Sequence, residues 1–450
     1  MPFNWKPNYH QNGVDVHLPR GKLLRRATGA VAVLGLVATV PSSAVAAAST
    51  RSPITVTYWT WGGGLMWKQV QANLDRETGK NIVLKVRSIT PTDYNSVLTT
   101  AMDAGTGPDV FKDRTGTMMQ QFAAAKLISP LNGKVSLAHF GAAPISTVTY
   151  RGHEWGVPQV TEEMVAFYNK AIFAKLHLSV PSTWDQLIGD LAKVKAAGIT
   201  PVYMMGTQQW LIALDFDEVA ATIVGNATAA NIVSRKANFT SPAFVKALTD
   251  FQQLGKYLEP DFQAIGAAGN EQEVQFAEGH AAVIFDGLFD LSGIDQAKPK
   301  FQIGEFLVPG QTAAQRPLLD WYPNGSYALN SKITNPQVRA ASIALLKYLG
   351  TPSFGKLMVD DSQETDAMNG IPIPSSEPLL RQAYTWYVQQ AQHPLIGIDS
   401  AMDMPPVNSK DIGIFQAEQN VLVQLLQGTV TPKAAAASIQ KSTAWYFSGK

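Results

Sequence analysis

The sequence of 450 residues contains no cysteine. Disulfide bonds, thiolate metal ligands and cysteine nucleophiles are therefore excluded, and so is a lipid anchor on an N-terminal cysteine. Only seven histidines are present, and the H-E-x-x-H motif of many zinc enzymes does not occur. Charged residues make up 16% of the chain and hydrophobic residues 46%, a balance typical of a globular protein. We expect neither a metal nor a cofactor.

The chain also lacks a run of about 20 apolar residues, the length that a membrane-spanning helix needs. Its N-terminal apolar run, Ala27 to Val40, follows basic residues between Arg20 and Arg26 and precedes small residues that end at Ala48. This order is typical of a secretory signal peptide, which we predict over residues 1–48. Arg25-Arg26 leaves a twin-arginine export route open beside the general secretory route.

Acidic and basic residues are nearly balanced, 35 against 36. Cleavage after Ala48 removes five basic residues and one acidic residue, which leaves the mature chain slightly acidic. A nucleic-acid partner is not indicated, because proteins that bind nucleic acid carry an excess of Lys and Arg. We expect an exported monomer of the periplasm or the outer face of the cell envelope, not anchored through cysteine.

At this length two lobes are expected, because one hydrophobic core rarely serves more than about 300 residues. The mature chain begins with the strand-like segment 54–59 and then alternates helical and strand-like patterns over 65–78, 81–89, 92–105 and 107–112. Such alternation predicts an α/β architecture with a parallel sheet. From about Asn335 the chain is mostly helical, with the clearest amphipathic patterns at 336–350 and 414–428.

Five sequence features in a fixed order carry a family resemblance. They are "GPDVF" at 107–111, "GVPQVTEEMVAFYNKAIF" at 156–173 followed by "VPSTWDQL", "FAEGHAAVIFDGLFDLSGI" at 276–294, the segment 323–359 that starts "PNGSYALNS", and "GIPIPSS" at 370–376. Each motif is weak alone, and their shared order makes the resemblance specific. Nearly the whole mature chain resembles the extracellular solute-binding proteins of ABC importers, in particular the sugar-binding group that includes maltose-binding protein.

The resemblance implies a two-lobed periplasmic-binding-protein fold with discontinuous lobes, three crossing segments and a ligand cleft between the lobes. The first lobe is expected from residues 49–160 plus 287–324, and the second from 161–286 plus 325–450. The implied function is a non-catalytic receptor that binds a carbohydrate outside the cytoplasm. Its implied partners are the membrane permease subunits of an ABC importer, to which it delivers the carbohydrate.

The segment "ITVTYWTWGGG" at 54–64 supplies the first candidate ligand contacts. Indole covers the apolar face of a pyranose and offers one N–H to its hydroxyl groups, so Trp59 and Trp61 are expected to contact a sugar. Gly62 lets the backbone approach closely, because glycine has no Cβ. The alternative is that one of the tryptophans belongs to the core. In the resembling sugar binders an Asp-Arg pair, here Asp113 and Arg114, hydrogen-bonds sugar hydroxyls; a surface ion pair is the alternative.

Further candidates come from the expected crossings and the second lobe. Glu162 and Glu163 are adjacent on a strand-like segment, so they point to opposite faces and cannot act together as a glycosidase pair. The family motif indicates that Glu162 faces the ligand, with a solvated hinge charge as the alternative. The other positions implied by the resemblance are Trp210, Asp286, Phe289, Trp321, Tyr322 and Asn324. Core packing is the alternative for Phe289 and Trp321.

Two other functions stay open from the sequence. An exported carbohydrate-active enzyme would use a carboxylate of "TEE" at 161–163, although the sequence offers no second convergent carboxylate. The same fold with a polyamine or peptide ligand is the other alternative, and the Asp113-Arg114 pair disfavours a polyamine. The acidic run Asp215–Glu218 lacks the spacing of a calcium loop, and we interpret it as a charge cluster at a helix end.

Overall fold

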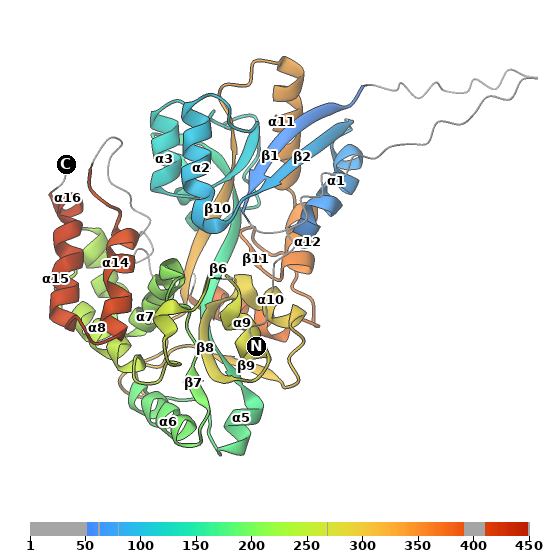
Figure 1. The fold of residues 1–450 in the computed structure, drawn as a ribbon. Helices are drawn as coiled ribbons and strands as arrows, with labels where there is room; N and C mark the ends of the chain where they lie inside the picture. Colours follow the sequence, from blue (N-terminus) through green and yellow to red (C-terminus); the bar gives the residue numbers. More distant parts are fainter. Residues whose placement is uncertain (1–51, 62–63, 80, 268, 391–409, 449–450) are drawn as a thin grey trace, which may run out of the picture. The chain divides into compact units, whose positions relative to one another are not determined.

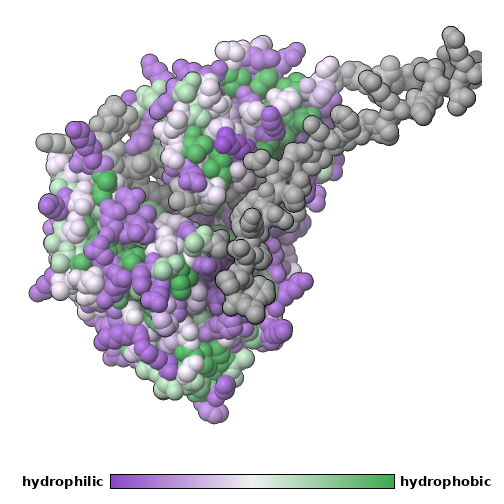
Figure 2. Space-filling model, viewed as in Figure 1, coloured by the Kyte–Doolittle hydropathy of each residue, from purple (hydrophilic) through white to green (hydrophobic). Residues whose placement is uncertain are grey.

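The computed structural model describes residues 52–448 except 62–63, 80, 268 and 391–409 (Figure 1). The predicted signal peptide and Gly62 therefore lie outside the described residues. These described residues form one compact unit. None of the helices among the described residues combines the length and apolar composition needed to cross a membrane. The face shown in Figure 2 intermixes hydrophilic and hydrophobic residues.

Helices and strands alternate over most of the chain. The strands are β1 Ile54–Thr60, β2 Ile82–Ser88, β3 Val110–Asp113, β4 Thr149–Tyr150, β5 His153–Glu154, β6 Gly156–Asn169, β7 Thr200–Val202, β8 Ala281–Gly287, β9 Ile303–Phe306, β10 Asp320–Leu329 and β11 Thr365–Asp366. The helices are α1 Gly64–Thr78, α2 Pro91–Asp103, α3 Thr117–Ala124, α4 Ala142–Thr147, α5 Lys170–Lys175, α6 Trp184–Ala196, α7 Gln209–Val233, α8 Pro242–Leu254, α9 Glu271–Ala277, α10 Leu291–Gln296, α11 Pro336–Leu349, α12 Pro352–Ser362, α13 Pro378–Gln390, α14 Ile414–Leu426, α15 Pro432–Ser442 and α16 Ala444–Phe447, with 3₁₀ turns η1 Phe262–Ala264 and η2 Leu288–Asp290.

One mixed sheet runs through the molecule in the order β2-β1-β3-β10-β6-β8-β7, and β9 and β11 also pair with β6. β1 is parallel to β2 and β3, and β7 is parallel to β8. The central pairs β3–β10, β10–β6 and β6–β8 are antiparallel. The predicted parallel sheet is therefore correct at its two ends and wrong at its centre, because the long strands β6 and β10 run in opposite directions.

β6 joins the two halves of this sheet. Its first part, Gly156–Met164, pairs with β10, and its last part, Met164–Asn169, pairs with β8 and β9. A strand of 14 residues is long for a globular protein, and this length lets one strand serve both halves. All but one of its residues are buried, which fits a strand covered on both faces.

Two large cores flank the sheet. One gathers α6, α7, α8, α14 and α15, with Phe216, Leu248 and Leu422 fully buried in it. The other gathers β1, α1, α11 and α12 and contains Val56 and Leu345. The helices α14 and α15 lie beside α7 and α8, although about 200 residues separate them in sequence (Figure 1). The packing groups α11 and α12 with β1 and α1, whereas the sequence analysis expects all of 325–450 in the second lobe.

Helix starts follow local signals in the sequence. Asn169 accepts hydrogen bonds from the backbone of α5, and Thr183 accepts one at the start of α6. Asn335, Thr351 and Thr431 do the same for α11, α12 and α15, each directly before a proline at the first helical position. These caps satisfy N–H groups that the helix itself leaves unpaired.

The acidic run in α7 does not lie where the sequence predicts. Asp215, Asp217 and Glu218 are 0%, 1% and 2% exposed, well inside the helix and not at its end. The prediction of a helix-end cluster is wrong, because α7 is covered by β6, β8, α8 and α14 on several sides. Helix periodicity alone does not reveal how many faces of a helix are covered.

Candidate functional site

Glu162 lies where β6 pairs with β10. Asn324 donates a hydrogen bond of 2.9 Å from its Nδ2 to Glu162 Oε1. Tyr322 is the direct cross-strand partner of Glu162. Side chains two apart on a strand share a face, so Tyr322 and Asn324 lie on one face of β10. Both are nearly buried, at 7% and 3% exposure.

Trp61 brings an aromatic surface to two cations at the end of β3. The Lys112 Nζ lies 3.9 Å and the Arg114 guanidinium carbon 4.4 Å from the centre of the Trp61 ring. Tyr94 packs edge-on against the same indole, with ring centres 4.8 Å apart. Trp61 is partly exposed, so the indole combines a rigid position with an accessible surface.

Charge connects this aromatic group to β6. Burial lowers the pKa of Lys112 to about 8, while the nearby Glu364 and Glu162 carboxylates oppose this shift. Burial also lowers the pKa of Arg114, and the nearby Glu162 and Tyr322 side chains oppose this shift. Burial raises the pKa of Glu364 to about 7, and Lys112 limits that rise. Two cations and two carboxyls thus compensate one another, with Lys112 and Glu162 buried and Arg114 and Glu364 partly exposed.

A second aromatic group packs against the cluster that contains Tyr322. Tyr322 packs with Met164, Met205 and Leu211, and the partly buried Trp210 and Phe289 pack against them. The rings of Trp210 and Phe289 are 6.2 Å apart and tilted by 44°. The indole N–H of Trp210, in the first turn of α7, donates to Gln208 Oε1 at 2.8 Å.

Seven of the predicted residues therefore form one connected set. Trp61 contacts Arg114, and Arg114 interacts electrostatically with Glu162. Glu162 accepts a hydrogen bond from Asn324 and pairs across the strands with Tyr322. Tyr322 belongs to the cluster against which Trp210 and Phe289 pack. The set combines three kinds of surface: aromatic rings, charged groups and an amide. This combination suits a ligand with apolar faces and a rim of hydroxyl groups.

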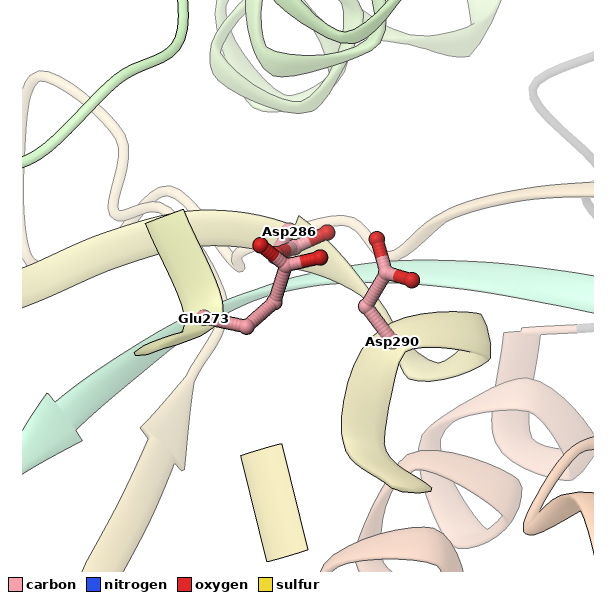
Figure 3. Close-up of side chains that lie close together, drawn as sticks. All are labelled: Glu273, Asp286 and Asp290. Carbon is pink, nitrogen blue, oxygen red and sulfur yellow. The ribbon is translucent and has the colours of Figure 1, made fainter. Parts of the chain in front are cut away.

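Four predicted residues lie apart from this set. Asp113 is 0% exposed, and burial raises its pKa well above the ordinary range. Trp321 is 2% exposed and packs against Tyr387, on the face of β10 opposite Tyr322. Trp59 lies against Arg87, with 4.4 Å from the guanidinium carbon to the ring centre. The fourth, Asp286, is 0% exposed and points toward the carboxyl groups of Glu273 and Asp290 (Figure 3).

The sequence analysis does not single out Lys112 and Glu364. The alternation of side chains along β3 could have identified Lys112. It places Lys112 on the same face of the sheet as Arg114 and Asp113 on the opposite face. Glu364 precedes the two-residue strand β11, which pairs with β6 next to Glu162. No local pattern signals this position, since a pairing over some 200 residues creates it.

A hollow of about 580 Å³ lies elsewhere, on α8 and the start of α15. Its lining consists of Thr240, Pro242, Val245, Lys246, Thr249 and Lys433. This lining offers no aromatic ring. We therefore place the candidate site on the connected set around β6, where the aromatic and polar groups converge.

Comparison with known proteins identifies the family. A family model described as bacterial extracellular solute-binding protein matches residues 66–355. The chain belongs to this family. The match includes β6 and β10, which carry Glu162 and Asn324, and it confirms the predicted resemblance.

Relatives within the solute-binding family have different named ligands. The chain is 27% identical over 340 residues to a multiple sugar-binding protein of Streptococcus mutans, which covers 72% of this chain and 79% of that protein. It is 25% identical over 285 residues to an sn-glycerol-3-phosphate-binding periplasmic protein of Pectobacterium atrosepticum, over 59% of this chain and 62% of that protein. These relatives are binding proteins by name.

Solved structures of the solute-binding fold match most of the chain. A chitin oligosaccharide binding protein aligns with a TM-score of 0.73 at 22% identity, over 88% of this chain and 99% of that one. A structure from a study of xylan utilization by the thermophilic bacterium Caldanaerobius polysaccharolyticus gives 0.74 at 21% identity, over 86% and 99%. This likeness confirms the predicted two-lobed α/β fold.

Proposed function

We propose that this solute-binding protein is a receptor for a mono- or oligosaccharide, which it holds at the connected set around β6. The observation that carries the proposal is the convergence of Trp61, Trp210 and Phe289 with the polar pair Glu162–Asn324. Aromatic rings take the C–H faces of a sugar, and charge-assisted hydrogen bonds take its hydroxyls. The sugar-binding relative from Streptococcus mutans supports the same ligand class.

The proposed contact residues are Trp61, Arg114, Glu162, Trp210, Phe289, Tyr322 and Asn324, with Lys112 added from the structure. Gly62 stays a prediction from the sequence, and so does Trp59. Asp113 and Trp321 are left out because both are buried away from the set. We leave out Asp286 for the same reason.

The proposed lobes meet at β6 and β10. We keep 49–160 and 287–324 in the first lobe and 161–286 in the second, with α14–α16. We move α11 and α12 to the first lobe, because they pack with β1 and α1. Sugar bound between the lobes draws them together by a hinge motion in the two shared strands, and the closed form is presented to permease subunits of an ABC importer. The protein works outside the cytoplasm.

The receptor is proposed to be non-catalytic. Glu162 and Glu163 lie on opposite faces of β6, and Glu163 lies with Thr365, away from the set. One observation favours a glycosidase as the second candidate. Glu364 interacts electrostatically with both Lys112 and Glu162, and burial raises its pKa to about 7, as a general acid would require.

A ligand panel decides between these functions. Tryptophan fluorescence of the full mature chain is titrated with mono- and oligosaccharides, sn-glycerol 3-phosphate and a polyamine. We expect saturable binding of one sugar class, recovery of that sugar intact by chromatography and a smaller radius of gyration in solution scattering. The Glu162→Gln variant should bind the same sugar more weakly, because a charge-assisted hydrogen bond is lost. Hydrolysis of the sugar would identify an enzyme, and binding of only the phosphate or the polyamine would overturn the carbohydrate proposal.

A further inference from the structure

The indole N–H of Trp210 is bound within the protein. Trp210 Nε1 donates to Gln208 Oε1 at 2.8 Å, and Gln208 Nε2 donates to the backbone oxygen of Gly266 at 2.6 Å. Gln208 directly precedes α7, and Trp210 lies in the first turn of this helix. One amide side chain thus joins the indole to a loop that lies 58 residues from Gln208 in sequence.

The loop that carries Gly266 is held in place on both sides of this contact. The backbone oxygen of Ile265 accepts hydrogen bonds from the Thr207 N–H at 3.0 Å and from the Thr207 hydroxyl at 2.8 Å. The Gly266 N–H donates to the carboxylate of Glu271, the first residue of α9. The carbonyl that anchors Gln208 therefore has a fixed position, and it fixes the amide in turn.

The bond to Gln208 uses the whole hydrogen-bonding capacity of the Trp210 side chain, because an indole has one N–H donor and no acceptor. Trp210 also packs on the cluster that contains Met205 and Leu211, with its ring centre 6.2 Å from that of Phe289. Apolar packing is non-directional, whereas a hydrogen bond weakens steeply as its angle changes. Gln208 therefore supplies a directional restraint on the ring.

The surface of the ring is what remains for a ligand. Trp210 is partly exposed, and so is Phe289 beside it. The apolar C–H face of a sugar can lie against such a surface without a hydrogen bond. The polar groups Glu162 and Asn324 are left to contact the hydroxyls.

We propose that Gln208 is a positioning residue of the sugar site. Its amide oxygen holds the Trp210 indole so that the ring surface, and not the N–H, meets the sugar, while Gln208 itself does not contact the sugar. This inference rests on the proposed function as a sugar receptor. It makes Trp210 a contact that selects for an apolar sugar face and does not read the pattern of hydroxyl groups.

The first experiment measures the bond between Gln208 and Trp210 without sugar. The full mature chain is labelled with ¹⁵N at the tryptophan indoles, and the Trp210 Nε1–H signal is identified by its loss in Trp210→Phe. We expect this proton to exchange slowly with solvent in the parent and in Gln209→Leu, a control at the exposed neighbouring position. In Gln208→Leu it should exchange at least about 10-fold faster, because the hydrogen bond that protects it is gone.

The second experiment measures the effect on sugar binding. The saccharides of the ligand panel, glucose and xylotriose among them, are titrated by calorimetry into the same variants. A saccharide that binds the parent should bind Gln208→Leu about 2- to 10-fold more weakly, as expected for one lost hydrogen bond, at a melting temperature close to that of the parent. Gln209→Leu should bind as the parent does.

A double-mutant cycle separates positioning from general stabilisation of the loop. In the Trp210→Phe background, which lacks the N–H, Gln208→Leu should cause no further loss of affinity, because the two changes remove the same bond. A residue that merely stabilised the loop would cause the same loss in both backgrounds. If Gln208→Leu does not fold, Gln208→Met, which keeps the length of the side chain, takes its place.

Three results would overturn the proposal: slow exchange in Gln208→Leu, parent-like sugar binding by that variant, or equal losses in both backgrounds. A parent that binds no saccharide would overturn the proposed function, and this role with it. The exchange experiment tells the two failures apart, because it needs no sugar.

Discussion

Two of the predicted tryptophans differ in what surrounds them. Trp61 is partly exposed and lies against two cations at the end of β3. Trp321 is 2% exposed and lies edge-on against Tyr387 at 4.8 Å. Both indoles are aromatic anchors, but only the first has a face that a ligand can reach. Replacement of each should therefore affect a different measurable property.

At the residue scale we predict that Trp61→Ala weakens sugar binding about 5- to 150-fold with little loss of fold, as expected when a binding anchor is removed. Trp321→Ala should instead lower the free energy of unfolding by about 3–5 kcal/mol. Calorimetric titration with the sugar found in the panel and a denaturant melt on both variants separate the two effects. Intact affinity in Trp61→Ala would remove the indole from the site.

Alternation along a strand predicts part of this site, and the family motif misleads at another part. It separates Glu162 from Glu163, and the structure places Glu162 beside Asn324 and Glu163 toward Thr365. The same rule applied to β3 favours Lys112 over Asp113, whereas the family motif favours Asp113. Glu364 could not be predicted, because its place depends on the long-range pairing of β11 with β6.

At the element scale, β10 carries one residue that only glycine suits. Gly325 has φ +73°, and a Cβ there would overlap Gln159 Oε1 and lie 2.9 Å from Lys112 Cε. Its neighbour Asn324 contacts Glu162. The backbone at this point therefore sets the position of two side chains of the sugar set.

We predict that Gly325→Ala lowers the free energy of unfolding by about 1–3 kcal/mol, because the alanine must adopt a left-handed backbone conformation. It should also weaken sugar binding, since Lys112 must move. The matched control is Gly189→Ala in α6, an exposed helical position with open space around the added Cβ, where alanine should stabilise by about 0.5–1 kcal/mol. Urea denaturation and a binding titration check both variants; parent-like values for Gly325→Ala would show that β10 tolerates a side chain there.

At the scale of the whole molecule, many carboxyl groups are buried. Burial raises the pKa of Glu259 to about 7, of Asp366 to about 7 and of Glu305 to about 9. The unfolded chain releases these protons near pH 4, whereas the folded chain keeps them until a higher pH. The folded state thus binds more protons between these pH values, and stability must fall as pH rises through that window.

We therefore predict that the melting temperature falls between pH 5 and pH 8. Asp366→Asn should make the decrease in melting temperature smaller at pH values below 7. The amide keeps the oxygen that accepts the hydrogen bond from the Met368 N–H, and it cannot ionise. Asp103→Asn, an exposed substitution in α2, is the control for the loss of one acid from the net charge. Melts at intervals of half a pH unit check this; a melting temperature that rises over this range would contradict it.

The long shared strands also determine when the fold can be completed. β6 ends at residue 169, but its partner β10 starts only at residue 320. The core around α7 further needs α14, which ends at residue 426. A chain still emerging from the ribosome cannot make these pairings until nearly all of it has been synthesised, and contacts so distant in sequence form slowly. Such late completion keeps the nascent chain loose enough to be threaded unfolded through a membrane translocase, so the topology itself favours export before folding.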